Sequence, residues 1–453
     1  AQLYNNGDHV GAGGSLGGIW LAHPPHHEGT PFGRIAGAAL HGKPLIASEV
    51  GQNPPKTYRS AYYPGLAAVA AFQGWDAITP YAYSQSGAPT QRLTGPQGGA
   101  YEFESDPATI ASLAAAALIY RRGDVQPAQQ SVLIHADDDH VFQFHHTDNV
   151  GQAYENTGLF NRLIETHRLR VHLAPPPPPP PIQAEYHHTI TPAQALQQYD
   201  PTETEIQSDT GQLWRDWQRG IGTINTPRTQ SAYGLLGSHD PLQTADARFA
   251  IETPFATVSL SSLTDIPIRK SDRLLLTAVA RAENTGTVYD LVGSRILDAG
   301  RAPMIAEPVV GTVTIDTDRA GFRMYPVRAD GSRGPGVDVA VQNGQANFEL
   351  TADHETIFYE IDATDSAAAD NVDLPHRLRH LAALAETRDQ PELAATLLDS
   401  ALELAAEPRT SRQRVALLQR SGSDDAYHAA LREHVRLDRD DEVARLQLTR
   451  YLA

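Results

Sequence analysis

A short apolar segment at 45–47 delivers a carboxylate to its C-terminal end, and its surroundings strongly constrain the fold. Pro31 opens a small-residue helical pattern over 32–40 that stops at Gly42, and a polar, proline-rich loop follows Glu49. A helix, a strand and a loop in this order indicate parallel strands joined by helices. In such arrays the catalytic groups lie where the strands end. Glu49 is therefore the first candidate for a catalytic residue.

The alternation of helices and strands continues to about residue 123. The pattern predicts a helix over 62–73, a strand over 78–83 and a last helix over 108–120, for which Asp106 is a suitable N-cap. Helices of this length between strands imply parallel pairing. A complete eightfold barrel takes about 250 residues. Residues 1–123 therefore predict the C-terminal portion of a (β/α)8 TIM barrel, whose other units would precede this chain.

Three further regions are expected, so that the fold class is multidomain α/β plus all-β. Residues 124–221 form a connecting region, in which Pro175–Pro181 favour a stiff, solvated polyproline II spacer over a docking site. Residues 222–365 contain short β-branched runs separated by turn signals, which predict an antiparallel β-sandwich. Residues 372–453 predict a small helical tail.

The helical tail contains a weak internal repeat. The segments that begin at Glu392 and Asp425 align with each other, so that Leu398 meets Leu431 and Leu402 meets Val435. A period near this length is typical of tetratricopeptide-like helix pairs, which offer a surface to a protein partner. A plain helical hairpin is the alternative.

Composition excludes several classes of function. The net charge is −18, which argues against a nucleic-acid or anionic-membrane partner because phosphate binding needs a basic face. The chain has no cysteine, and so no disulfide, thiol nucleophile or cysteine metal site. No run of about 20 apolar residues is present to span a bilayer. Any signal peptide would lie upstream, so the location stays open, with a secreted or periplasmic bacterial protein favoured.

Several motifs resemble, in order, the seventh and eighth barrel units of clan A glycoside hydrolases, the group of retaining beta-galactosidase-like and cellulase-like enzymes. They are Gly-Lys-Pro-Leu-Ile-Ala-Ser-Glu at 42–49, Tyr58-Arg59, the segment ending in Gln-Gly-Trp-Asp at 67–76, and Tyr-Ala-Tyr-Ser at 81–84. Weaker similarity extends over roughly 15–360. The resemblance implies a β-linked oligosaccharide or polysaccharide substrate.

The resemblance also implies a role for Glu49. In that clan the glutamate ending strand seven is the nucleophile, and a second carboxyl group about 5–5.5 Å away is the acid/base. The clan's acid/base usually lies in an Asn-Glu pair, and no such pair precedes Glu49. We therefore expect the nucleophile without its acid/base, and a chain that is inactive alone. The mechanism requires no metal or organic cofactor.

Four side chains near the expected strand ends are candidate sugar contacts. The rings of Trp20, Tyr81 and Tyr83 could stack against the C–H faces of a sugar, and His23 could hydrogen-bond a hydroxyl. Core or loop packing for the aromatic rings, and structural capping for the histidine, are the alternatives. Many relatives carry a carboxylate where this chain has Ala61-Tyr62, so the identity of the substrate cannot be transferred.

Other functions are weaker alternatives. The missing acid/base and the helical repeat allow a non-catalytic carbohydrate-binding or scaffold protein. Gly13-Gly14-Ser15-Leu16-Gly17 matches the serine hydrolase string, but that motif needs a strand before it and a helix after it, and its flanks are loop-like. His135, 137–140 and His145-His146 could supply metal ligands, although a solvated loop is the simpler interpretation.

Overall fold

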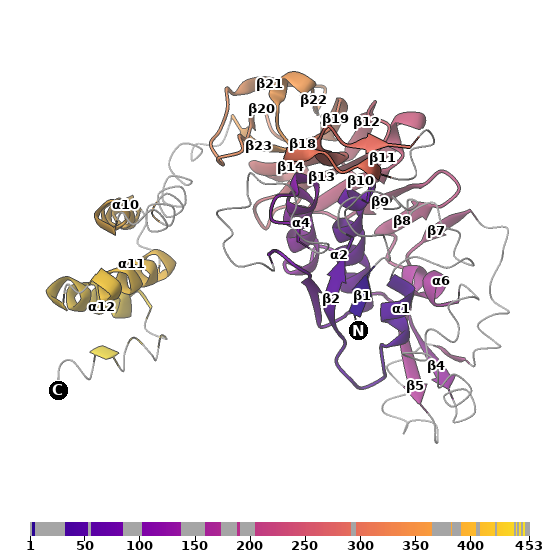
Figure 1. Cartoon of the computed structure of the whole chain (residues 1–453), viewed down its shortest axis with the longest axis horizontal. Coiled ribbons are helices and arrows are strands. Elements are labelled where there is room, and N and C mark those ends of the chain that lie inside the picture. The colour runs from indigo at the N-terminus through magenta and orange to yellow at the C-terminus, as the bar shows by residue number, and fades with distance from the viewer. Residues whose placement is uncertain are drawn as a thin grey trace. The chain divides into compact units, whose positions relative to one another are not determined.

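The structure is a computed structural model of the chain (Figure 1). It describes residues 2–4, 32–52, 56–84, 102–136, 159–173, 188–190, 204–290, 296–364, 382, 391–404, 408–421, 424–438, 441, 444 and 447–448. The chain divides into two compact units, residues 1–365 and 366–453. Each unit has hydrophobic clusters of its own.

One antiparallel sheet of thirteen strands dominates the first unit. Its spatial order is β11-β12-β19-β22-β21-β20-β23-β14-β13-β10-β9-β8-β7. In chain order the strands are β7 (Glu205–Gln207), β8 (Leu213–Asp216), β9 (Ile221–Asn225), β10 (Thr229–Gly234), β11 (Leu242–Gln243), β12 (Ala247–Ile251), β13 (Ala256–Ser262), β14 (Arg273–Val279), β19 (Gly311–Asp316), β20 (Gly321–Pro326), β21 (Val337–Gln342), β22 (Gln345–Leu350) and β23 (Phe358–Ala363).

The large sheet folds over at β21. This strand pairs with β20 along one edge, and through Val341 and Gln342 with β22 along the other. The rings of Phe322 on β20 and Phe348 on β22 have centroids 5.7 Å apart, and both are fully buried. The two arms of the sheet therefore share one hydrophobic core.

Parallel strands occur in two small sheets. One has the order β1-β2-β3 and consists of β1 (Gln2–Tyr4), β2 (Ile46–Gly51) and β3 (Ala77–Pro80). The other has the order β5-β4-β6 and consists of β4 (Ser131–Ala136), β5 (Arg168–Leu173) and β6 (His188–Ile190). Two short ladders complete the strands: β15 (Ala282–Thr285) with β18 (Arg301–Ala306), and β16 (Val288–Tyr289) with β17 (Ile296–Asp298).

The prediction of a TIM-barrel portion is wrong. Among the described residues most strands belong to the thirteen-stranded antiparallel sheet, and the parallel strands lie in the two three-stranded sheets. The alternation of helices and strands specifies parallel pairing between neighbours, but it does not fix how many strands join or which element covers them. In the expected sandwich over 222–365, one continuous antiparallel sheet forms both layers by folding over at β21, and this sheet extends beyond that range to β7 and β8.

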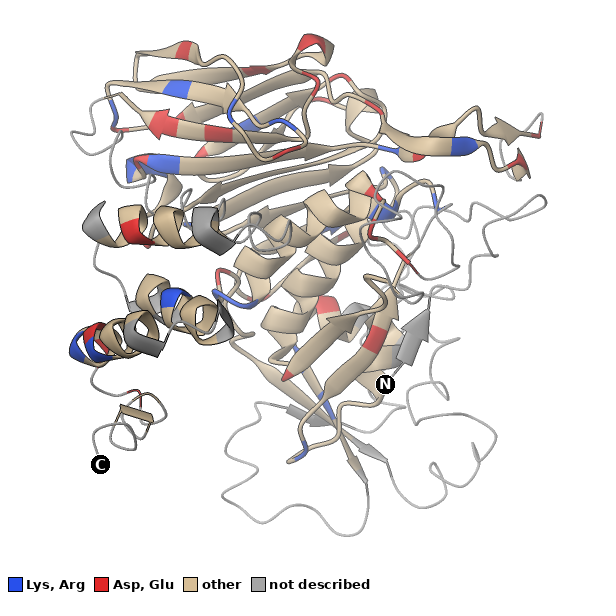
Figure 2. Cartoon of the chain, turned by 60° about the vertical axis from the view of Figure 1, so that its left-hand side comes forward, with Lys and Arg blue, Asp and Glu red and all other residues tan. Residues whose placement is uncertain are grey.

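Two helices without a charged residue lie between the large sheet and β1-β2-β3. They are α2 (Tyr62–Gln73) and α4 (Pro107–Tyr120), as Figures 1 and 2 show. A helix that is apolar all round belongs in an interior. Gly74, at φ 62°, ends α2 in the left-handed conformation that glycine adopts without strain. The predicted cap of α4 is correct, since the Asp106 side chain accepts a hydrogen bond from the Ala108 amide.

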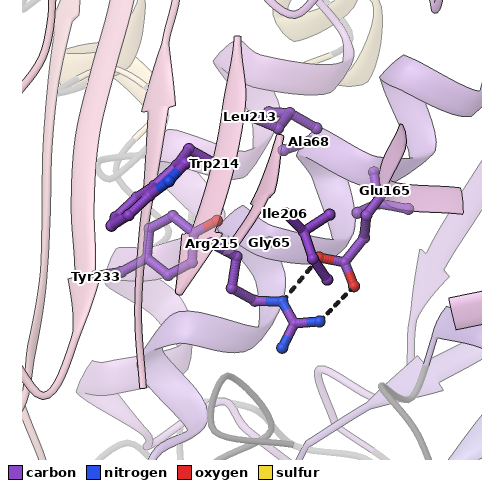
Figure 3. A pocket seen from close by; sticks show the side chains of 9 residues that line it. Gly65, Ala68, Glu165, Ile206, Leu213, Trp214, Arg215 and Tyr233 are labelled. Carbon is purple, nitrogen blue, oxygen red and sulfur yellow. Dashed lines mark hydrogen bonds and ion pairs between the residues drawn. The ribbon is translucent and has the colours of Figure 1, made fainter. Parts of the chain in front are cut away.

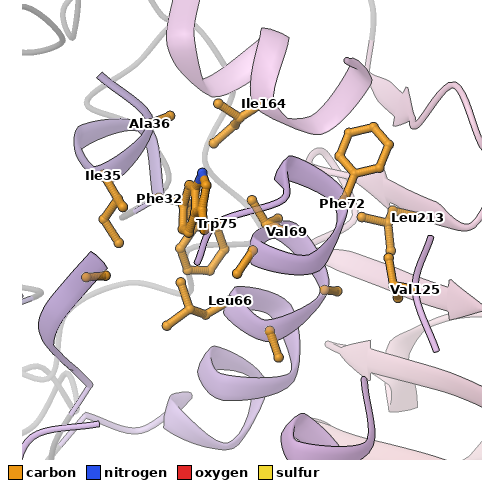
Figure 4. Close-up of a cluster of buried hydrophobic side chains, with 14 of the residues drawn as sticks. Phe32, Ile35, Ala36, Leu66, Val69, Phe72, Trp75, Val125, Ile164 and Leu213 are labelled. Carbon is orange, nitrogen blue, oxygen red and sulfur yellow. The ribbon is translucent and has the colours of Figure 1, made fainter. Parts of the chain in front are cut away.

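The core around α2 joins elements from three layers (Figure 4). Helices α1 (Phe32–Gly37) and α6 (Leu159–Thr166) pack one face of it. Ala47 and Val50 come from β2, and Leu213 from the large sheet. Trp75 of the Gln-Gly-Trp-Asp motif is buried in the same core. The short 3-10 turns of this unit are Arg59–Ala61, Leu236–Ser238, Ile268–Lys270 and Ala352–His354.

The second unit contains three helices of equal length among its described residues: α10 (Pro391–Leu404), α11 (Pro408–Ser421) and α12 (Asp424–Leu437). Leu398 and Leu431, which the expected repeat aligns, are both fully buried. In the described part of the chain, no helix combines the length and the apolar character that crossing a membrane requires. The polyproline segment Pro175–Pro181 lies outside the described residues.

Candidate functional site

Strand β2 carries Glu49 near its carboxyl end. It is the central strand of its sheet and pairs in parallel with both neighbours, with Glu49 opposite Gln2 and Val50 opposite Pro80. Ala47 and Val50 anchor the strand in the core, whereas Glu49 is half-buried. Because the strands are parallel, their carboxyl ends lie at one edge of the sheet. Glu49 therefore lies close to the segments that leave β3.

The segment after β3 brings both predicted tyrosines to this edge. The Tyr81 amide donates to the Val50 carbonyl at 2.9 Å, which continues the pairing of β2 with β3 beyond Pro80. Tyr81 is half-buried, and Tyr83 is 49% exposed. The Tyr83 ring lies edge-on to Phe103, with centroids 6.0 Å apart. Tyr83 thus keeps much of its ring open to solvent while the buried Phe103 fixes its position.

A third backbone segment extends the edge beyond Tyr83. The amide of Phe103 donates to the Ala82 carbonyl at 3.1 Å, and the amide of Glu104 donates to the Tyr83 carbonyl at 3.0 Å. Residues 49–52, 81–84 and 102–104 thus form three adjacent backbone segments, which we call the carboxyl edge. Sequence reasoning found the first two segments and missed the third.

A buried ion pair supports the carboxyl edge. Arg59 and Asp106, each at most 1% exposed, are joined by two hydrogen bonds, from Nε at 2.6 Å and from Nη2 at 2.8 Å. Arg59 also donates to the Lys56 carbonyl at 2.9 Å and to the Ala282 carbonyl at 2.6 Å. Paired, planar contacts of this kind fix geometry as well as charge. The start of α2 is thereby tied to the start of α4 and to β15.

Two buried tyrosines lie beneath the edge at the start of α2. Burial raises the pKa of the Tyr62 phenol far above its ordinary value. Burial, and then the neighbouring Tyr62 and Asp106, raise the pKa of Tyr63 in the same way. The Tyr63 hydroxyl donates to the Val50 carbonyl at 3.3 Å. Both phenols are therefore neutral at ordinary pH. Tyr63 contributes a hydrogen bond, and the Tyr62 ring packs against Phe32 and Tyr63.

Three polar residues of the carboxyl edge were not predicted from the sequence. They are Gln52, Ser84 and Glu104, whose side-chain oxygens are buried and have no hydrogen-bond partner in the described part of the chain. Gln52 is 1% exposed and Glu104 is 6% exposed. No local pattern marks them, because the three segments that carry them lie far apart in the sequence and meet only in the fold.

Other predicted residues fall outside the described part of the chain. Trp20 and His23, both candidate sugar contacts, lie there, as does Ser15 of the serine hydrolase string. The same holds for the loop at 137–140 and for His145-His146. Among the described residues, one group has a spacing that could hold a metal ion, namely His434, Asp438 and Asp441 in the second unit.

A concave region lies between α2, α6 and the strands β8 and β10 (Figure 3). It is lined by Gly65, Ala68, Val69, Glu165, Ile206, Leu213, Trp214, Arg215 and Tyr233. Arg215 donates from Nε and Nη2 to the two Glu165 oxygens, each at 2.7 Å. Burial, followed by the Glu165 charge, raises the pKa of Tyr233. The Arg215–Glu165 ion pair joins β8 to α6, and each charged group has the other as its partner. We therefore interpret this pocket as structural and do not take it as the candidate site.

Comparison with known proteins adds no constraint on this site. The chain matches no protein-family model and no curated protein.

Proposed function

We propose that the carboxyl edge is part of the active site of a retaining glycoside hydrolase, with Glu49 as its nucleophile. One observation carries the proposal: β2 and the continuation of β3 bring Glu49, Tyr81 and Tyr83 to the same edge of one parallel sheet. Catalytic groups of parallel sheets concentrate at this edge. The resemblance of the 42–84 block to clan A enzymes supports the same role for Glu49.

The chemistry requires an ionised carboxylate beside the anomeric carbon of a sugar. Glu49 would attack that carbon, the bond to the leaving oxygen would break, and the aglycone would depart with the bonding electrons. Water would then hydrolyse the glycosyl ester and regenerate the carboxylate. A natural leaving group also needs a proton from a second carboxyl group. Because no Asn-Glu pair precedes Glu49, we assign only the nucleophile to this chain.

The aromatic side chains indicate the class of ligand. Tyr83 offers a half-exposed ring at the carboxyl edge, and Tyr81 lies two residues before it. Aromatic rings combine an apolar face with a polar hydroxyl, a combination that suits the alternating C–H and O–H surfaces of a sugar. We therefore propose a β-linked oligosaccharide or polysaccharide as the substrate.

Covalent trapping tests the nucleophile directly. The whole chain is incubated with 2,4-dinitrophenyl 2-deoxy-2-fluoro-β-glucoside and with its galactoside analogue. Because dinitrophenolate departs without protonation, labelling needs the nucleophile but no acid. We expect the added glycosyl mass on the peptide that contains Glu49, and no label in Glu49→Gln. Glu349→Gln, a matched change at an exposed position of β22, should label normally.

The outcome also separates the two functions that the sequence left open. A label on a different carboxyl group, or no label with either reagent, contradicts the proposed nucleophile. Saccharide binding without any label, unchanged in Glu49→Gln, would favour the non-catalytic carbohydrate-binding protein instead.

A further inference from the structure

Buried polar oxygens without partners gather at the carboxyl edge. Gln52 contributes Oε1, Ser84 contributes Oγ, and Glu104 contributes both carboxylate oxygens; none of these atoms has a hydrogen-bond partner among the described residues. A buried polar group without a partner costs free energy, and a buried carboxylate costs more than a neutral group. Native proteins contain few such atoms, so their grouping in one place needs an explanation.

The backbone brings these three residues to neighbouring positions. Gln52 directly follows β2, and Ser84 follows the segment whose Tyr81 amide bonds to Val50 of that strand. The backbone amide of Glu104 donates a hydrogen bond to the carbonyl of Tyr83, the residue before Ser84. The three residues therefore lie on three adjacent backbone segments, at the end of the sheet where Glu49 is found.

Loose packing does not account for the missing hydrogen bonds. The Asp106 side chain, two residues after Glu104, accepts from Arg59, from the Ala108 amide at 3.1 Å and from the Thr109 hydroxyl at 2.6 Å. Phe103, on the other side of Glu104, is 4% exposed and contacts the rings of Tyr63 and Tyr83. Glu104 thus lies in a segment where Phe103 is packed among aromatic rings and the Asp106 carboxylate has its hydrogen bonds.

The chemistry of the unpaired atoms indicates a ligand that donates several hydroxyl protons. An ionised carboxylate and an amide oxygen only accept hydrogen bonds, whereas a serine hydroxyl both donates and accepts. Neighbouring hydroxyl groups of a sugar supply such donors, and the adjacent Tyr83 ring supplies an apolar surface. A divalent cation is less suitable, because among the described residues no group of three acidic or histidine side chains is close enough at this edge to bind one.

We propose that Gln52, Ser84 and Glu104 form a sugar-binding subsite, in which the Glu104 carboxylate accepts hydrogen bonds from ligand hydroxyls. This proposal rests on the proposed function, since it places one sugar unit of the substrate beside Glu49. It adds a binding role for Gln52 and Glu104, which none of the quoted motifs includes, and for Ser84, to which the resemblance assigns no role.

Calorimetric titration of the whole chain with lactose and with cellobiose tests the subsite. Glu104→Gln keeps the shape but removes the charge, and should weaken binding by about ten- to a hundredfold, as expected for a lost hydrogen bond to a charged acceptor. Its melting temperature should equal or exceed that of the unchanged protein, because an unpaired buried charge is removed. Ser84→Ala should weaken binding less, and Glu349→Gln should not change it.

Three results would overturn the subsite. The first is that the unchanged protein binds neither disaccharide. The second is that Glu104→Gln and Ser84→Ala both bind as tightly as the unchanged protein. The third is stabilisation by calcium chloride that Glu104→Gln abolishes, which would assign a cation instead. The trapping experiment is independent of these outcomes: binding that depends on Glu104, without a label on Glu49, rejects the hydrolase but retains the subsite.

Discussion

Two buried polar regions of the first unit differ in how completely their hydrogen bonds are made. Across β10 and β13, the Thr229 hydroxyl donates to Asp124 at 2.7 Å and lies 2.8 Å from the Ser261 hydroxyl, and Ser231 donates to Ser259 at 2.8 Å. At the carboxyl edge, the oxygens of Gln52, Ser84 and Glu104 have no such partners in the described part of the chain. Hydrogen bonds thus satisfy the buried hydroxyls across β10 and β13, whereas four buried oxygens of the carboxyl edge stay without partners among the described residues.

The buried ion pair beneath the edge should show the largest effect on stability. Arg59→Ala removes the guanidinium from a fully buried carboxylate, and breaking such a pair costs about 3–5 kcal/mol. Chemical denaturation measures the loss. Arg281→Ala, which removes an exposed pair with Glu307, is the matched control and should cost about 0–1 kcal/mol. Equal losses in the two variants would mean that Arg59 does not organise the edge.

The hydroxyl pairs across β10 and β13, Thr229 with Ser261 and Ser231 with Ser259, form a ladder. Mutations in this ladder should lower the stability less than Arg59→Ala does. Thr229→Val preserves the shape but leaves the Ser261 hydroxyl and one Asp124 oxygen with fewer partners, so we expect a loss of about 1–3 kcal/mol. Thr314→Val, at a half-exposed position whose hydroxyl contacts Asn347, should lose less than Thr229→Val by the same denaturation assay. A ladder variant as stable as the unchanged protein would remove the contrast between the regions.

The Gln52 amide oxygen, which has no partner among the described residues, should show the smallest effect. Gln52→Met keeps a similar volume and removes an oxygen that is buried without a partner, so stability should stay within about 0.5 kcal/mol or rise slightly. Denaturation in the absence of sugar gives the value. A loss as large as that of Thr229→Val would show that Gln52 has a structural partner, which would weaken the proposed subsite.

Local signals predicted the elements around the site well. The helix predicted over 62–73 is α2, and the Asp106 side chain caps α4 as expected. Each of these signals depends on residues within one helical turn of the element. Glu49 could be placed near the end of its strand for the same reason, because the apolar run and the loop after it adjoin each other in the sequence.

The overall architecture could not be predicted from the same signals. The sequence of α4 does not indicate that this helix packs against β13 and β14 of an antiparallel sheet. The alternation of helices and strands therefore led to the prediction of a barrel. Arg59 of the Tyr58-Arg59 motif bonds to Asp106 and to the Ala282 carbonyl, partners that its sequence neighbours do not indicate. No sequence pattern predicts a role for Glu104, because a backbone hydrogen bond to Tyr83, a distant residue in the sequence, places it at the carboxyl edge.

The bond from Arg59 to the Ala282 carbonyl joins residues 223 positions apart in the chain. Contacts between such distant residues form late and slow the formation of the native state. During synthesis, the Arg59 guanidinium can form this hydrogen bond only after β15 has left the ribosome, although the segment that contains Glu49 and Arg59 emerges much earlier. In nascent chains halted before that point, the N-terminal region should be incompletely packed, and chaperones bind states of this kind.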